Sequence, residues 1–274
     1  MQDRNGYHFL QQLHLMKTPI QTPSFWLKRI ALSLGISATL SVSALAGTTP
    51  LVKNGVDWGT NYYAAADGVL PGGSSFPTWS LSGAGTISLE DDLLVVSTTD
   101  TQSRRIYTTA GIDWSQGSMT VEFSLKVDSV HSVYGTTVLI GDGTNYVSVD
   151  IGLSSFRVGK VASGGTYDFT QLTTFRLVIE NMDSENRTAT VYINNSPEAV
   201  LTATGTSGFT SGTASTANYL QFGDPSTTPG GVGGVTRWES ISWTPGAFVP
   251  IPEPSAALLM VTGLGLALAW RHRK

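Results

Sequence analysis

The sequence predicts an all-β fold in which two antiparallel sheets pack face to face, a β-sandwich of the jelly-roll type. Residues 118–128 alternate strictly between apolar and polar side chains, with the period of two that is typical of a half-buried strand. Other short apolar segments are separated by Gly, Asn, Asp, Ser and Thr, which favour turns. Between residues 47 and 250, no window of a dozen residues carries a helical stripe.

About eleven short strands are expected in that region. In the 118–128 segment, the apolar face consists of Met119, Val121, Phe123, Leu125 and Val127. The other strand candidates are Leu93–Ser97, Arg105–Thr109, Thr137–Ile140, Tyr146–Ile151, Phe156–Val161, Phe175–Glu180, Thr190–Asn194, Ala199–Ala203, Tyr219–Phe222 and Val235–Trp243. The polar segment 183–187 lies between two of them and predicts a hairpin.

Residues 1–46 have the pattern of an export signal with a signal helix. Lys28 and Arg29 precede a run of 17 uncharged residues. This run ends with Ala44 and Ala46, small residues at the positions that signal peptidase requires, so cleavage is expected after Ala46. A start at Met16 would give a signal of ordinary length, 31 residues. An uncleaved membrane anchor is the alternative, although the run is short for a span of about 20 residues.

The C-terminal end predicts a transmembrane helix. Residues 255–270 are uncharged, and as a helix they would reach roughly 24 Å against a hydrocarbon core of about 30 Å. The basic residues Arg271, Arg273 and Lys274 follow, and they are expected to stop the helix on the cytoplasmic side of the membrane. Upstream, Pro252, Glu253 and Pro254 predict an extended segment at the outer membrane face.

These three parts, in this order at the extreme C-terminus, resemble the PEP-CTERM sorting domain of Gram-negative bacteria. The resemblance covers about the last 25 residues and implies processing by an exosortase near the Pro-Glu-Pro motif. It also implies a host that makes an exopolysaccharide matrix. The expected partners are signal peptidase and the general secretion machinery, the inner membrane and the exosortase, and exopolysaccharide is a further candidate. A plain C-terminal tail anchor is the alternative.

The expected domains are the signal (1–46), an N-terminal extension (47–75), the sandwich (76–248) and the sorting segment (249–274). Residues 47–250 hold nine basic and 18 acidic residues, a net charge of −9. A phosphate backbone would be repelled by such a surface, so we expect no nucleic-acid partner. The chain has no cysteine, which excludes disulfides, thiol catalysis and cysteine-based zinc sites.

The order of strands in residues 76–245 resembles the concanavalin A-like or laminin G-like jelly roll. The resemblance is carried by the strand from Phe175 to Ile179, by the segment from Val191 to Asn195 and by the last strand, from Arg237 to Ile241. In addition, Phe222-Gly223-Asp224 opens a glycine-rich loop before that last strand. The resemblance implies a two-sheet sandwich.

No catalytic residue and no cofactor are expected. Between residues 47 and 250, His131 is the only histidine, and it lies in a loop-like segment. Jelly-roll glycosidases of the laminarinase kind use a Glu-x-Asp-x-x-Glu strand. The nearest match here, Glu180, Asp183 and Glu185, has its aspartate one position late and lies in the predicted hairpin turn. A secreted jelly-roll glycoside hydrolase or lyase stays open as the alternative.

Two kinds of binding site have candidate residues. Asp142, Asn145 and Asp150 are calcium candidates, because calcium takes clustered oxygen ligands. However, the Asp-Gly-Thr-Asn sequence between two strands is equally typical of a turn, and we favour the turn.

Sugar recognition needs exposed aromatic rings beside amide or carboxylate groups. Trp58, Tyr62 and Tyr63 precede the first clear strand and are the candidates for a loop-borne glycan site. Aromatic residues of a sandwich also serve as core. The sequence therefore predicts an exported, non-enzymatic surface or matrix protein, with glycan binding at these residues. A ligand-free structural or adhesive protein is the other alternative.

Overall fold

The computed structural model describes residues 51–53, 56–72, 79–99, 101–130, 133–211, 217–225 and 233–251. Within these ranges, no helix combines the length and the apolar character that crossing a membrane requires. Several predicted features fall outside the described residues: Ala44, Ala46, His131, Pro252, Glu253, Pro254, Arg271, Arg273 and Lys274.

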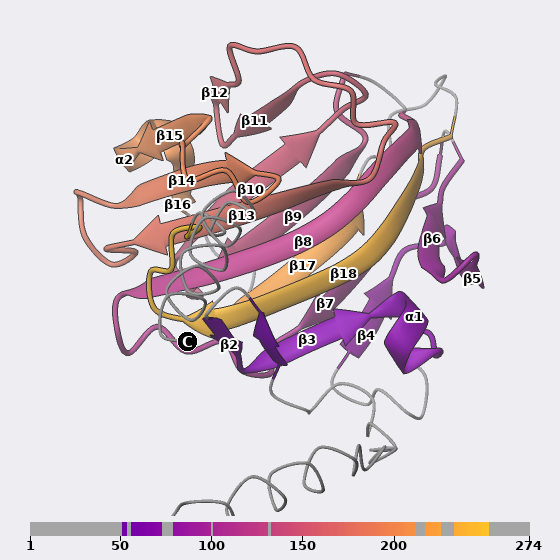
Figure 1. Ribbon diagram of the computed structural model, residues 1–274, viewed down its shortest axis with the longest axis horizontal. Helices are drawn as coiled ribbons and strands as arrows, with labels where there is room; N and C mark the ends of the chain where they lie inside the picture. The colour runs from indigo at the N-terminus through magenta and orange to yellow at the C-terminus, as the bar shows by residue number, and fades with distance from the viewer. Residues whose placement is uncertain are drawn as a thin grey trace, which may run out of the picture. The chain divides into compact units, whose positions relative to one another are not determined.

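The described chain forms two antiparallel sheets, which we call sheet I and sheet II, and this confirms the predicted all-β sandwich. In sheet I the described strands follow the order β15-β14-β13-β8-β18-β6-β5, and β3 pairs with β18. Its strands are β3 (Thr60–Tyr63), β5 (Thr86–Glu90), β6 (Leu93–Ser97), β8 (Ser118–Ser129), β13 (Thr173–Glu180), β14 (Thr188–Ile193), β15 (Leu201–Thr204) and β18 (Val235–Pro245). Figure 1 shows this sheet with β9, β17 and β7 of the other layer behind it.

Sheet II follows the order β12-β11-β10-β9-β17-β7-β4 in the described residues, with β16 paired to β10. Its strands are β4 (Trp79–Ser82), β7 (Arg104–Thr108), β9 (Thr136–Gly141), β10 (Asn145–Ile151), β11 (Phe156–Val158), β12 (Val161–Ala162), β16 (Phe209–Ser211) and β17 (Tyr219–Asp224). The remaining elements are the hairpin of β1 (Leu51–Lys53) and β2 (Val56–Trp58) and the single helical turns α1 (Ala64–Asp67) and α2 (Gly205–Gly208).

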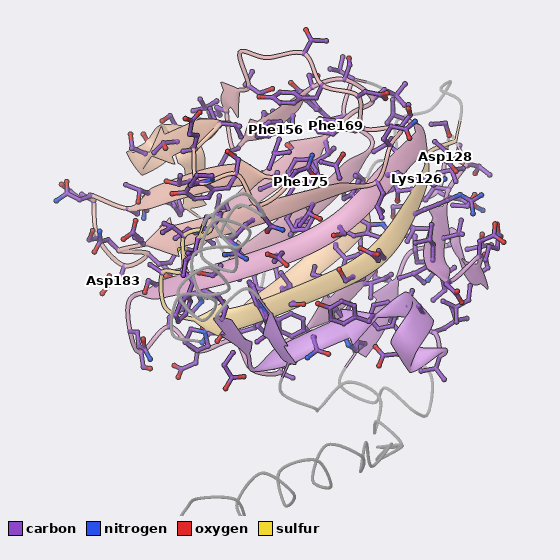
Figure 2. The ribbon with its side chains drawn as sticks, in the orientation of Figure 1. Lys126, Asp128, Phe156, Phe169, Phe175 and Asp183 are labelled. Carbon is purple, nitrogen blue, oxygen red and sulfur yellow. The ribbon has the colours of Figure 1, made fainter. Side chains whose placement is uncertain are left out.

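The core lies between the sheets and takes up the apolar side of the 118–128 segment, as predicted. This strand is not half-buried, however, because its polar residues Thr120, Glu122 and Ser124 are buried on the other side of sheet I. The five apolar residues of the 118–128 segment are all fully buried, together with inward residues of β9, β10 and β17. Aromatic rings fill one part of this space. Phe175 lies 5.8 Å from Phe156 and 5.1 Å from Phe169, measured between ring centroids, and Figure 2 shows the three side chains grouped together.

Most predicted strands occur with shifts of one or two residues at their ends. β6 has the predicted bounds, and the predicted hairpin joins β13 to β14. The predicted strand from Phe156 to Val161 is broken by a turn at Gly159, which has a φ of +57°. A side chain at Gly159 would meet the carbonyl oxygen of Gly208 at 2.5 Å, so only glycine fits there.

Two local predictions need correction. Phe222, Gly223 and Asp224 lie within β17 rather than opening a loop, because they pair with β7. In the predicted N-terminal extension, β3 pairs with β18 and places Tyr62 in the core, so part of residues 47–75 belongs to the sandwich.

Candidate functional site

Sheet II carries on its outer face a row of side chains that crosses five strands. The strand register places Ser80 opposite Tyr107, Tyr107 opposite Gln221, Gln221 opposite Leu139, and Leu139 opposite Ser148. Directly opposite residues of antiparallel strands have Cβ atoms about 4.5–5.5 Å apart. The five side chains therefore form a continuous line, which we call the tyrosine row.

Tyr107, the last residue but one of β7, presents its ring to solvent. The two residues beside it in the chain, Ile106 and Thr108, point into the core and are at most 2 % exposed. Because side chains alternate along a strand, Tyr107 must point outward, and its side chain is 37 % exposed. Its cross-strand neighbour Gln221 is partly exposed. An apolar ring face thus lies beside an amide, which can both donate and accept hydrogen bonds.

A second row runs parallel to the first on the same face, and we call it the arginine row. Here Arg105 pairs with Gly223, Gly223 with Thr137, Thr137 with Asp150, and Asp150 with Arg157. A Cβ on Gly223 would fall 2.4 Å from the carbonyl oxygen of Arg104, so this position holds no side chain. The arginine row therefore has no side chain rising from the sheet between Arg105 and Thr137.

Asp150 organises one end of the arginine row. It is 8 % exposed, and its Oδ1 accepts a hydrogen bond of 2.7 Å from the Thr137 hydroxyl. Its Oδ2 accepts a hydrogen bond of 2.7 Å from Nε of Arg157. The Arg157 guanidinium also lies over the ring of Tyr134, 4.7 Å from the ring centroid. These contacts hold the guanidinium in one orientation at the edge of the face.

Tyr219 of β17 lies next to the tyrosine row. The ring of Tyr219 lies over Gly141, where a Cβ would meet the ring at 2.8 Å. Burial raises the pKa of Tyr219 to about 12, and the nearby Tyr146 and Asp142 add to this effect. The hydroxyl therefore stays protonated at physiological pH, and it is buried without a hydrogen-bond partner among the described residues.

The aromatic residues predicted to form a loop-borne glycan site lie on strands instead, so that part of the prediction is wrong. Trp58 lies on β2 and Tyr62 on β3, and both side chains are 0 % exposed. The Tyr62 hydroxyl donates a hydrogen bond of 3.2 Å to the carbonyl oxygen of Val69. Tyr63 is partly exposed on the outer face of sheet I, opposite Ser240. Successive side chains of β3 point to opposite faces of sheet I, so Tyr62 enters the core and Tyr63 points outward. Trp58 lies apart from both on β2.

Trp58 covers a buried ion pair on the outer face of sheet I. Arg176 donates hydrogen bonds of 3.0 Å from Nε and 2.6 Å from Nη2 to Oε2 of Glu122. Its Cζ lies 5.5 Å from the Trp58 ring centroid. The register places Tyr192 beside Arg176 and Ser242 beside Glu122. In this part of the described sheet, Glu122 thus faces a guanidinium, whereas retaining glycoside hydrolysis needs a second carboxyl about 5 Å away.

Tyr192 next to this pair is held in its neutral form. Burial raises its pKa, and the Glu180 carboxylate raises it further. A phenol with a raised pKa is a poor general base at neutral pH, although it still donates hydrogen bonds. The geometry therefore makes this group suited to binding or structural support.

The calcium candidates separate into two places. Asp142 builds the predicted turn: its Oδ1 accepts hydrogen bonds from the backbone N–H groups of Thr144 at 2.7 Å and Asn145 at 2.6 Å. Asp150 lies at the other end of β10 and is engaged by Thr137 and Arg157, so it does not join Asp142. Among the described residues there is no group of three His, Cys, Asp or Glu side chains that could hold a metal ion.

The Glu180–Glu185 segment lies where the sequence predicts it. Glu180 ends β13, and the backbone N–H of Ser184 donates to the carbonyl oxygen of Asn181 within the turn. Figure 2 shows Asp183 at the end of sheet I opposite to Lys126 and Asp128. The candidate residues that sequence reasoning missed are Tyr107 and Gln221. The alternation of Ile106, Tyr107 and Thr108 was the available signal for an outward tyrosine.

Neither a protein-family model nor a curated protein matches the chain. Among solved structures, the carbohydrate esterase vb_24B_21 from Shiga toxin-encoding bacteriophage phi24B is 15 % identical, covers 67 % of this chain and 95 % of its own, and has a TM-score of 0.48. The Emp47p carbohydrate recognition domain is 11 % identical, with coverages of 62 % and 89 % and a TM-score of 0.39. Alginate lyase A1-II', a member of polysaccharide lyase family 7, is 11 % identical, with coverages of 58 % and 82 % and a TM-score of 0.43. At such identities and TM-scores their activities do not carry over to this chain, and the sandwich rests on its own strand pairing.

Proposed function

We propose that the protein binds glycans without enzymatic activity, through the outer face of sheet II. The observation that carries this proposal is the exposed ring of Tyr107 with the Gln221 amide directly across from it. A pyranose ring has an apolar C–H face and a rim of hydroxyl groups. The aromatic ring packs against the first, and the amide exchanges hydrogen bonds with the second.

The shape of the tyrosine row suits an extended ligand. Its members come from five adjacent strands, which are spaced about 4.8 Å apart. A polysaccharide that lies across the strands would therefore place successive sugars over successive side chains. Ser80 and Ser148 at the two ends add hydroxyl groups that pair with sugar hydroxyls.

We further propose that the protein is exported and works at the cell surface or in an extracellular polysaccharide matrix. The support is the sequence: a signal with cleavage after Ala46, and the resemblance of the C-terminus to a PEP-CTERM sorting domain. Signal peptidase, the inner membrane and an exosortase acting near Pro252, Glu253 and Pro254 are the partners in this route.

Glycan binding is tested by replacing Tyr107 with alanine in the full-length protein, purified in a non-ionic detergent. Affinity for a panel of soluble polysaccharides, measured by calorimetry, should fall at least about tenfold for Tyr107→Ala, because truncating an aromatic anchor removes more than about 1.4 kcal/mol of binding free energy. Tyr63→Ala is the matched control, since Tyr63 lies on the outer face of the other sheet. An equal affinity in the wild type and Tyr107→Ala would reject the site.

The sorting route has a separate test. Mass spectrometry of the exported protein should find a chain that begins near Gly47 and lacks the basic end Arg271–Lys274. Replacing Pro252, Glu253 and Pro254 together by alanine should hold the protein in the inner membrane. An intact basic end on the exported wild-type protein would contradict processing.

A further inference from the structure

We propose that the glycan bound by sheet II is a polyuronate, whose carboxylates are taken by the arginine row. This proposal rests on the proposed function, and it names the chemical class of the ligand. The first observation is charge. The ionised side chains that point outward from the described strands of sheet II are Arg105, Arg157 and Asp150, which sum to +1.

The rest of the molecule has the opposite sign. Residues 47–250 carry a net charge of −9. A net positive sheet face on a strongly acidic protein favours a negative partner at that face, because complementary potentials concentrate and orient such a ligand.

Arg157 is already held in a binding orientation. Its Nε is engaged by Asp150 and its guanidinium lies over Tyr134. In the described part of the chain, no hydrogen bond engages its Nη1 or Nη2, and its side chain is 44 % exposed. These two N–H₂ groups can form the paired hydrogen bonds that a planar carboxylate accepts from arginine. Because the side chain is fixed beforehand, little conformational entropy is lost on binding.

Arg105 lies on the same face, beside Tyr107 on β7. Its Nη2 donates a long hydrogen bond of 3.4 Å to the carbonyl oxygen of Pro225, and its Nε is buried without a hydrogen-bond partner in the described residues. Its Nη1 takes part in no hydrogen bond with the described residues and the residue is partly exposed, so Nη1 can donate to a ligand next to the aromatic ring. A sugar stacked on Tyr107 would bring a carboxylate within reach of it.

The separation of the two arginines argues for a polymer. They lie on β7 and β11, with β17, β9 and β10 between them. Four strand spacings amount to roughly 19 Å, which exceeds the span of one sugar. A chain that crosses the strands would meet both arginines. A uronic acid in each repeat would supply a carboxylate at both ends of the arginine row.

The test compares three soluble polymers with the full-length protein in a non-ionic detergent: polygalacturonate, a neutral β-glucan and dextran sulfate. We expect polygalacturonate to bind at least about tenfold more tightly than the neutral glucan. Raising the salt from about 0.01 M to about 0.15 M should reduce this preference, because it shortens the Debye length from about 30 Å to about 8 Å. Arg105→Gln and Arg157→Gln should each reduce the ratio of the two affinities at least fivefold.

Arg237→Gln is the matched control, since Arg237 is a partly exposed, ion-paired arginine of sheet I, and it should leave the ratio unchanged. Arg157→Lys keeps the positive charge but removes the planar pair of N–H₂ donors. A lower affinity of this variant for polygalacturonate therefore supports paired hydrogen bonds to the carboxylate. Thermal melts of all variants identify any that fail to fold. If the neutral glucan binds as tightly as polygalacturonate and this binding depends on Tyr107, the ligand is not specifically a polyuronate, but the proposed glycan binding stands. If dextran sulfate binds as tightly as polygalacturonate, the site does not select carboxylates. If no polymer binds, both proposals are wrong.

Discussion

Arg176 and Glu122 show how a charged pair is accommodated in a protein with few charges. Their side chains are 1 % and 3 % exposed, and two hydrogen bonds join the guanidinium to one carboxylate oxygen. Trp58 lies over the guanidinium. Removing one member of a buried pair leaves the other charge without its compensation, which costs far more than losing a surface pair.

We therefore expect Arg176→Met to reduce the free energy of unfolding by roughly 3–5 kcal/mol, measured by urea denaturation. Arg237→Gln removes two partly exposed ion pairs, with Glu90 and Asp128, and should cost clearly less than Arg176→Met. Equal losses for the two variants would show that burial does not decide the contribution of Arg176.

Glu90 illustrates a titration at the surface. Its pKa is lowered first by the hydrogen bond from Ser88 and then by Arg237. A carboxyl with a lowered pKa in the folded state contributes stability above its unfolded pKa. This contribution is lost as the pH falls through the folded value.

Ser88→Ala should therefore raise the pKa of Glu90 toward its ordinary value, followed by NMR titration. Arg237→Gln should raise it as well, because this change removes both a hydrogen bond and the attraction of the guanidinium charge. An unchanged pKa of Glu90 in either variant would contradict the role given to the side chain that was replaced.

At the scale of elements, β3 is one of the strands that the sequence does not predict, as are β4, β5 and β16. It pairs with the middle of β18, Ile241 opposite Tyr62 and Ser240 opposite Tyr63. Tyr62 therefore enters the core while its neighbour faces outward. Four polar and aromatic residues in a row, Thr-Asn-Tyr-Tyr, have no apolar alternation by which such a strand could be recognised.

The two tyrosines give a matched pair of variants. Tyr62→Ala should lower the free energy of unfolding by roughly 3–5 kcal/mol, since it leaves a cavity between the sheets. Tyr63→Ala, on the outward side of the same strand, should cost well under half of that. Denaturant unfolding of both variants measures the difference, and similar losses would contradict the assignment of β3 to the sandwich.

At the scale of the whole molecule, one continuous core joins the two sheets. Trp238 from sheet I contacts Phe222 from sheet II at 4.7 Å between ring centroids, and Trp79 lies 5.5 Å from Trp243 across the same interface. The sheets therefore cannot lose their packing separately. Their pairing also joins distant parts of the chain, such as β3 with β18.

We expect the sandwich to unfold in one cooperative transition. Tryptophan fluorescence and far-UV circular dichroism should then give the same denaturation midpoint. Refolding should take milliseconds to seconds, because pairings between distant strands are slow to form. Two separate midpoints would indicate that the sheets unfold independently.

The turns and individual strands could be predicted from local sequence. β6 and the hairpin of β13 and β14 follow from alternation and turn residues, and Asp142 closes its turn with contacts only two and three residues away. The candidate site could not be found in this way. The sequence directed attention to Trp58 and Tyr62, whose burial depends on contacts far along the chain.

By itself, the sequence determined the class of fold, because an alternating apolar pattern can bury its apolar side only against another sheet. Only the tertiary structure decided which side chains become neighbours. Tyr107 meets Gln221, and Arg105 shares a row with Arg157, through the register of β7, β17, β9, β10 and β11. Register between distant strands is set by how the whole core packs, and no local pattern contains that information.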